Sequence, residues 1–151
     1  VGSGPPSTNA KVIARSFDEG WGGSVIKTVS LDHTKVRNVA PRFGKLNSPK
    51  TNETIGFTNI ELITDRPLEI WLEEIKELKK QYPEKIIVGS MMEEPSKERW
   101  QKLTDLLCKA GVDLLEINFS CPHGMPERKM GLAMGQCPDI VEEVTGWVKE
   151  A

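Results

Sequence analysis

At 151 residues, with 38% hydrophobic and 28% charged residues, the chain has the length and composition of one globular domain. Its net charge of −2 favours neither nucleic acid nor a membrane as a partner, and we expect no membrane span and no signal peptide. Three cysteines, an odd number at unremarkable spacings, argue against a disulfide framework, so we expect a reducing, cytoplasmic compartment.

The chain opens with a predicted helix and a predicted strand. A helix over residues 8–20 would be capped by Ser7 or Thr8 and ended by Gly20. The β-branched run SVIKTVS, residues 24–30, predicts a short buried strand that one lysine interrupts.

The next region is poor in periodic signals. Residues 31–57 are rich in Asn, Pro, Lys and Gly and predict a loop, and a loop of that length is usually functional or disordered. The run TNIELIT, residues 58–64, predicts a second brief strand. Apolar residues then recur at helical spacing, so residues 67–81 predict an amphipathic helix.

The second half of the chain repeats a strand and a helix twice. KIIVGSMM, residues 85–92, predicts an apolar strand, and the helix after it would begin at Ser96 and end at Gly111. VDLLEINFS, residues 112–120, predicts a parallel strand covered on both faces, because its Leu/Ile content is nearly continuous. Pro138 suits the first turn of a last helix.

This alternation of helices and strands predicts a parallel α/β fold, either an open doubly wound sheet or a (β/α)8 TIM barrel. A complete barrel needs about 250 residues. We therefore interpret residues 1–151 as about the first half of a (β/α)8 barrel, and so as a piece of a larger enzyme.

Polar residues at two predicted strands are candidates for chemistry. Lys27 interrupts the first strand, beside Thr28, and a buried ammonium group costs several kcal/mol unless it is paired. Lys27 therefore either points at an anion or extends its alkyl chain to the surface.

Asn118, Ser120 and Cys121 close the last predicted strand, at the end where parallel barrels hold their active sites. The alternative is that Asn118 and Ser120 satisfy a turn and that Cys121 is a small buried hydrophobe. A glycine-punctuated loop follows, in which we expect Cys121 to be partly exposed. Its glycines are Gly124, Gly131 and Gly135.

A zinc or iron–sulfur site within this segment is not expected. Cys108, Cys121, His123 and Cys137 lack a Cys-x2-Cys pair, and Cys108 belongs to a predicted helix away from the strand end. We therefore predict no metal site in this chain.

Four motifs in order, GSGPPST, EGWGGSVIKTVSLD, NIELI and INFSCPHGMPERKMGLAMGQ, resemble the flavin-binding barrel of the dihydropyrimidine dehydrogenase family. The class 1 dihydroorotate dehydrogenases of the same superfamily share the Lys-Thr pair and the Ser-Cys-Pro motif. The residues after Cys-Pro are more similar to the dihydropyrimidine enzymes. The alternatives are a dihydroorotate dehydrogenase, or another flavin-dependent reductase, and a non-catalytic α/β binding piece.

The resemblance implies that FMN binds at the mouth of the barrel and that the 5,6 double bond of uracil or thymine is reduced. The positions that match flavin contacts are Ser3, Lys27 and Thr28. Those that match or adjoin the pyrimidine site are Asn59, Glu61, Asn118, Phe119 and Ser120. Cys121 matches the general acid that protonates C5 while a hydride from FMN reaches C6, and a thiol with a pKa near ~8.5 is mostly protonated at neutral pH.

The same resemblance implies partners outside this chain. In the family, FAD, iron–sulfur clusters and NAD(P)H on other domains or subunits supply electrons, and we expect an oligomer. We also expect the glycine-rich loop to let a lid over Cys121 move.

Overall fold

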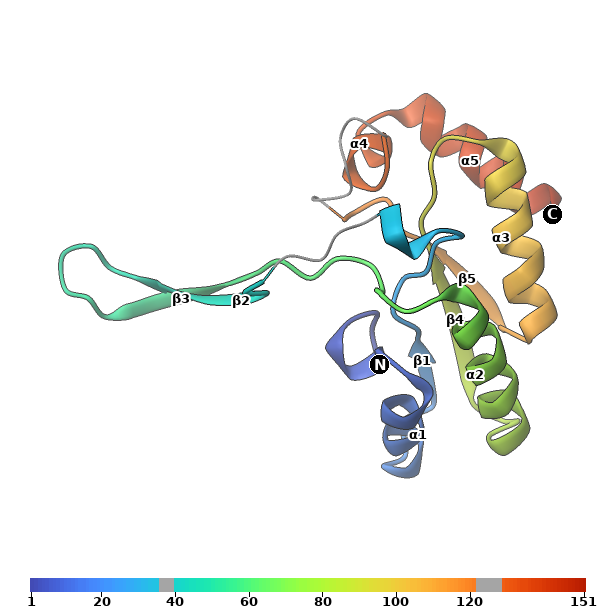
Figure 1. The fold of residues 1–151 in the computed structure, drawn as a ribbon, viewed down its shortest axis with the longest axis horizontal. Helices are drawn as coiled ribbons and strands as arrows, with labels where there is room; N and C mark the ends of the chain where they lie inside the picture. Colours follow the sequence, from blue (N-terminus) through green and yellow to red (C-terminus); the bar gives the residue numbers. More distant parts are fainter. Residues whose placement is uncertain (36–39, 122–128) are drawn as a thin grey trace.

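The computed structural model describes residues 1–35, 40–121 and 129–151, and in this part of the chain a parallel α/β unit carries a projecting hairpin (Figure 1). The parallel sheet contains β1 (Gly23–Val25), β4 (Ile86–Met91) and β5 (Leu114–Ile117), in the order β1-β4-β5. The strands pair in chain order, and helices link β1 to β4 and β4 to β5. The prediction of a parallel α/β fold is therefore confirmed.

Helices supply most of the hydrophobic core. They are α1 (Ala10–Asp18), α2 (Leu68–Gln81), α3 (Lys97–Ala110), α4 (Leu132–Gly135) and α5 (Pro138–Glu150), with short 3-10 turns η1 (Pro5–Ser7) and η2 (His33–Lys35). α2 packs against α1 and α3, and α3 packs against α5. Trp71 of α2 and Trp100 of α3 are fully buried in this core with Ile87 of β4. No helix in the described ranges is long and apolar enough to cross a membrane.

Most of the predicted helix ends are confirmed, but the cap of α1 is not. Asn9 is the N-cap, and its side chain accepts a hydrogen bond of 3.0 Å from the Val12 amide. Ser7 is unavailable as a cap because its hydroxyl bonds to carbonyl groups within the preceding turn. Gly111 ends α3 with a φ of 100°, a left-handed conformation that glycine adopts without steric cost.

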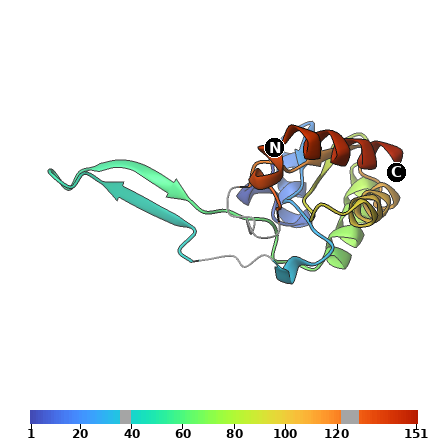
Figure 2. The same ribbon diagram turned by 90° about the horizontal axis from the view of Figure 1, so that it is seen from above.

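The predicted loop at 31–57 is wrong where β2 (Phe43–Asn47) and most of β3 (Thr54–Asn59) lie, and the strand predicted at 58–64 is confirmed only at residues 58 and 59. β2 and β3 form an antiparallel hairpin that projects from the body (Figures 1 and 2). Both faces of the hairpin are exposed, so its sequence lacks the alternation that burial of one face imposes. Residues 60–64 are irregular and are held by single backbone bonds, such as that from the Thr64 amide to the Thr28 carbonyl at 2.8 Å.

In the described part of the chain, the last strand is covered on one face only. Leu115 and Ile117 of β5 pack against the helical core, whereas Leu114 is 60% exposed. Ile86, which is on the neighbouring strand, is 43% exposed. The sheet therefore has one covered face and one open face that still carries apolar side chains.

Candidate functional site

The chain beyond β1 contains one extra residue relative to its neighbour. Val25 lies opposite Val88, and Val29 bridges to Met91. Four residue steps on the first chain thus face three steps on the second, which is a β-bulge. A regular strand would send consecutive side chains to opposite faces, and the bulge removes that constraint.

Lys27 and Thr28 lie in this bulge. The Lys27 amide donates to the Ser7 carbonyl at 3.0 Å, and the Thr28 carbonyl accepts from the Thr64 amide at 2.8 Å. These bonds satisfy backbone groups that the sheet ladder leaves unpaired. The side chains of both Lys27 and Thr28 therefore line the same cavity.

This cavity, of about 770 Å³, lies at the carboxyl ends of β1 and β5 and is also lined by the end of β3. It brings together all of the residues that the sequence analysis proposed for the site. They are Ser3, Lys27, Thr28, Asn59, Glu61, Asn118, Phe119, Ser120 and Cys121.

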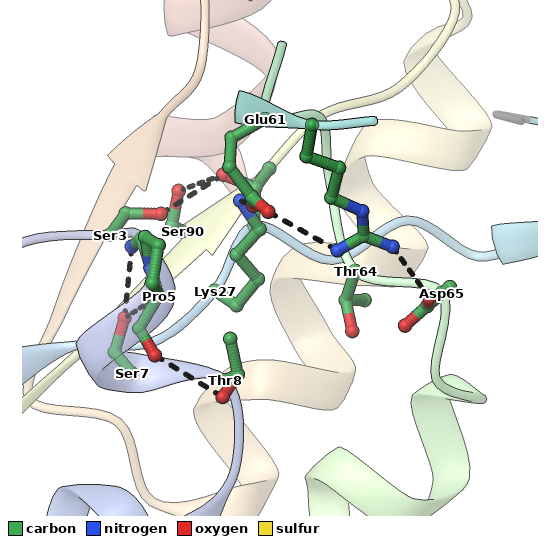
Figure 3. Close-up of polar contacts among 12 residues, drawn as sticks. Ser3, Pro5, Ser7, Thr8, Lys27, Glu61, Thr64, Asp65 and Ser90 are labelled. Carbon is green, nitrogen blue, oxygen red and sulfur yellow. Dashed lines mark hydrogen bonds and ion pairs between the residues drawn. The ribbon is translucent and has the colours of Figure 1, made fainter. Parts of the chain in front are cut away.

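Lys27 and Glu61 form a buried ion pair, and Figure 3 shows the lysine directed toward the carboxylate. Lys27 Nζ lies 2.6 Å from Glu61 Oε2, and the two side chains are 8% and 11% exposed. Arg42, at the base of the hairpin, reaches the other carboxylate oxygen at 3.2 Å and also pairs with Asp65. Burial raises the pKa of Glu61, but the hydrogen bonds and charges of Lys27 and Arg42 outweigh it and hold the pKa below its usual value.

The hydroxyl of Thr28 is the centre of a second polar cluster. Its oxygen lies 2.7 Å from Ser90 Oγ, 3.0 Å from Asn118 Nδ2 and 3.3 Å from Ser3 Oγ. Ser90 was not predicted as part of the site. The sequence feature that could have indicated Ser90 is the one that indicated Lys27: a polar side chain within an otherwise apolar strand.

The Asn118 side chain holds the turn after β5, which is the alternative role that the sequence analysis gave it. Its Oδ1 accepts the backbone amides of Ser120 and Cys121 at 3.0 and 3.1 Å, and also the Ser120 hydroxyl. Its Nδ2 donates to Thr28. One N–H of this amide is left over for a ligand, because the group carries two.

Cys121 is 7% exposed, so the prediction of partial exposure is wrong for the described residues. It packs in a small cluster with Leu62, Ile63, Met92 and Met130. The residues that follow directly, 122–128, lie outside the described ranges and include Gly124 and His123 of the predicted loop.

Gly131 and Gly135 permit close packing against the strand end. A Cβ at Gly131 would lie 2.5 Å from the Cys121 carbonyl oxygen, and a Cβ at Gly135 would lie 2.3 Å from that of Phe119. Gly131 also has a φ of 56°. The sequence analysis assigned these glycines to a movable lid, whereas the structure gives them a packing role.

A buried carboxylate missed by the sequence analysis holds the neighbouring loops. Glu93 is fully buried after β4 and accepts hydrogen bonds from Ser30 Oγ at 2.7 Å and the Leu31 amide at 2.6 Å. Arg99, on α3, donates to it at 2.7 Å. Its sequence signal is an acidic residue directly after an apolar strand. Within the described ranges, no group of three His, Cys, Asp or Glu residues could hold a metal ion.

The fold and the cavity define a parallel α/β protein with a polar ligand site at the carboxyl ends of its strands. No protein-family model matches the chain. The chain is 55% identical over 152 residues to the chloroplastic dihydropyrimidine dehydrogenase (NADP(+)) of Arabidopsis thaliana, covering 98% of this chain and 36% of that protein.

Two other relatives extend the comparison. The NAD-dependent dihydropyrimidine dehydrogenase subunit PreA of Escherichia coli K12 is 38% identical, over 99% of this chain and 35% of that protein. The catalytic subunit of dihydroorotate dehydrogenase B (NAD(+)) of Methanosarcina acetivorans is 28% identical, over 99% of this chain and 44% of that protein. The chain is thus homologous to dihydropyrimidine dehydrogenases, as its motifs predicted, and spans about a third of the length of these dehydrogenases.

Proposed function

We propose that this chain is the part of a dihydropyrimidine dehydrogenase that holds FMN and the pyrimidine. The whole protein would reduce the 5,6 double bond of uracil or thymine. The observation that carries this proposal is the convergence on one cavity of every residue that matches or adjoins the family's site. The identity of 55% over nearly the whole chain supports it.

The residues around the bulge fit FMN chemically. Lys27 offers the ammonium N–H groups that Glu61 does not accept, and Ser3 and Thr28 offer hydroxyl groups beside it. Such donors suit the oxygen-rich edge of a flavin. Bound FMN would supply the hydride that reduces C6 of the pyrimidine.

The remaining polar residues suit a pyrimidine ring, which alternates N–H donors and carbonyl acceptors. Asn118 has one amide N–H left to donate to a carbonyl oxygen. Asn59, exposed at the end of β3, offers both a donor and an acceptor at the cavity edge. We propose that the Cys121 thiol donates the proton that C5 receives, because a thiol is mostly protonated at neutral pH.

Orotate is a poorer fit than uracil as the substrate. Orotate carries a carboxylate, which requires an additional cation in the site. In the described ranges the cations nearest the cavity, Lys27 and Arg42, already have carboxylate partners in Glu61 and Asp65. We therefore favour the dihydropyrimidine enzyme over the dihydroorotate enzyme.

The proposal extends to the architecture of the whole protein. Three parallel strands in chain order, with one open apolar face, suit the first half of a (β/α)8 barrel whose other strands cover Leu114 and Ile86. FAD, iron–sulfur clusters and NAD(P)H would act on other domains or subunits of an oligomer, and the name of the E. coli relative, a subunit, is consistent with this. We propose a cytoplasmic location, with the chloroplast named for the Arabidopsis relative as the alternative.

The test uses the complete polypeptide, purified and reduced without oxygen. Uracil or thymine should reoxidise the flavin rapidly, and Cys121→Ala should slow this step at least ~100-fold, as expected for a lost general acid. Cys108→Ala is the matched control, because Cys108 is exposed on α3. Reoxidation by orotate alone, or the absence of any bound flavin, would contradict the proposal.

A further inference from the structure

The direction of the hydrogen bonds at Thr28 can be worked out from its partners. A hydroxyl has one proton to donate and two lone pairs that accept. Thr28 Oγ1 has three neighbours within 3.3 Å, namely Ser3, Ser90 and Asn118. Two of them can donate to Thr28, and Thr28 can donate once.

Asn118 must be a donor to Thr28. Its Oδ1 accepts the backbone amides of Ser120 and Cys121, which have no other orientation to offer, so the amide oxygen faces the turn. The Nδ2 group therefore faces Thr28, at 3.0 Å. One lone pair of the Thr28 oxygen is occupied.

Ser90 must be a donor as well. It is fully buried, and Thr28, at 2.7 Å, is its only side-chain hydrogen-bond partner in the described ranges. If Ser90 accepted from Thr28, its own proton would be buried without an acceptor, which costs about 1–3 kcal/mol. The second lone pair of Thr28 is therefore occupied too.

We propose that Ser90 is a positioning residue: with Asn118, it directs the Thr28 proton into the cavity, where Thr28 donates to a lone-pair atom of bound FMN. That atom is a carbonyl oxygen or an unprotonated ring nitrogen. Without a ligand, Ser3 accepts the proton over a long 3.3 Å contact, and its exposed hydroxyl can turn toward water instead. This inference rests on the proposed function, because it names FMN.

The experiment measures the Kd for FMN of the complete apoprotein by fluorescence titration. Ser90→Ala should raise the Kd about 2-fold, because Asn118 still occupies one lone pair and the Thr28 proton then distributes over two staggered positions instead of one. Thr28→Val should raise it about 10-fold through loss of the donor. In the Thr28→Val background, Ser90→Ala should add less than ~1.5-fold, since no hydroxyl remains to be oriented.

Two further variants separate positioning from stability. Ser90→Cys keeps the side-chain size and a weak donor, so its Kd should stay closer to that of the wild type than the Kd of Ser90→Ala does. Ser24→Ala is the matched control, because Ser24 is a buried serine of the same sheet whose hydroxyl has no hydrogen-bond partner in the described ranges. Its Kd should be unchanged.

An equal effect of Ser90→Ala in both backgrounds, or an unchanged Kd in Ser90→Ala, would overturn the role of Ser90. These results leave the proposed function intact, because they require a wild type that binds FMN. A wild-type apoprotein that binds no FMN would instead overturn the proposed function. The flavin absorption maximum gives a second readout: Ser90→Ala and Thr28→Val should displace it in the same direction, and Ser24→Ala should not.

Discussion

Removing the carboxylate of Glu61 should destabilise the protein more than removing the ammonium group of Lys27. The two groups form a pair at 2.6 Å with little exposure, and loss of one partner of a buried pair costs about 3–5 kcal/mol. Glu61→Met should cost this full amount, because Lys27 has no second charged partner in the described ranges. Lys27→Met should cost about 1–2 kcal/mol, because Glu61 keeps Arg42 at 3.2 Å.

The double variant Lys27→Met/Glu61→Met sharpens this prediction. It removes both buried charges and places two apolar side chains in contact, so it should be more stable than Glu61→Met alone. Lys76→Met is the control: Lys76 and Glu73 form an exposed pair, and such pairs contribute about 0–1 kcal/mol.

Calorimetry of the flavin-free complete polypeptide checks the order of these variants, since a bound ligand would add its own stabilisation. For a complete barrel of about 250 residues, one kcal/mol corresponds to about 2 °C in Tm. Glu61→Met should therefore lower the Tm by at least ~6 °C, and Lys27→Met by clearly less. A loss for Lys27→Met equal to or larger than that for Glu61→Met would refute the reasoning.

Three further predictions concern Glu61, Gly135 and Asp113. The pKa of Glu61 is lowered, so its carboxylate stabilises the fold above the ordinary carboxylate pKa of about 4.3, and this stabilisation is lost as pH falls through the lowered value. The stability of Glu61→Met, measured by acid unfolding, should not show this loss. Gly135→Ala should destabilise the protein by about 1–3 kcal/mol, because the added Cβ would lie 2.3 Å from the Phe119 carbonyl oxygen. Its control in the same melting assay is Gly146→Ala, which lies in open space on α5 and should stabilise the protein by about 0.5–1 kcal/mol. Asp113→Ala should lower the free energy of unfolding by about 1–2 kcal/mol, because the Asp113 carboxylate accepts a hydrogen bond from the Ile87 amide near the start of β4. Hydrogen exchange of that amide should become faster, and unchanged exchange would contradict this.

The sequence by itself determined the features that depend on near neighbours. Helix periodicity, the glycine after α3 and the proline that begins α5 act within a few residues, and the structure confirms them. The strand ends were also readable, because Lys27 and Asn118 are polar groups within or directly after apolar runs. The resemblance of the motifs added Ser3, Asn59, Glu61 and Phe119, and all of the proposed site residues line the cavity.

The tertiary structure decided how those residues meet. Thr28 and Asn118 are 90 positions apart in sequence, and Thr28 and Ser90 are 62 apart, so no local pattern encodes their hydrogen bonds. The bulge that brings Lys27 and Thr28 to one cavity exists only relative to the register of a second strand. The same holds for Gly135, which is needed because its backbone packs closely against the Phe119 carbonyl oxygen, and that contact forms only when the chain has folded. Contacts of this kind depend on long-range packing, and packing is what local sequence patterns do not specify.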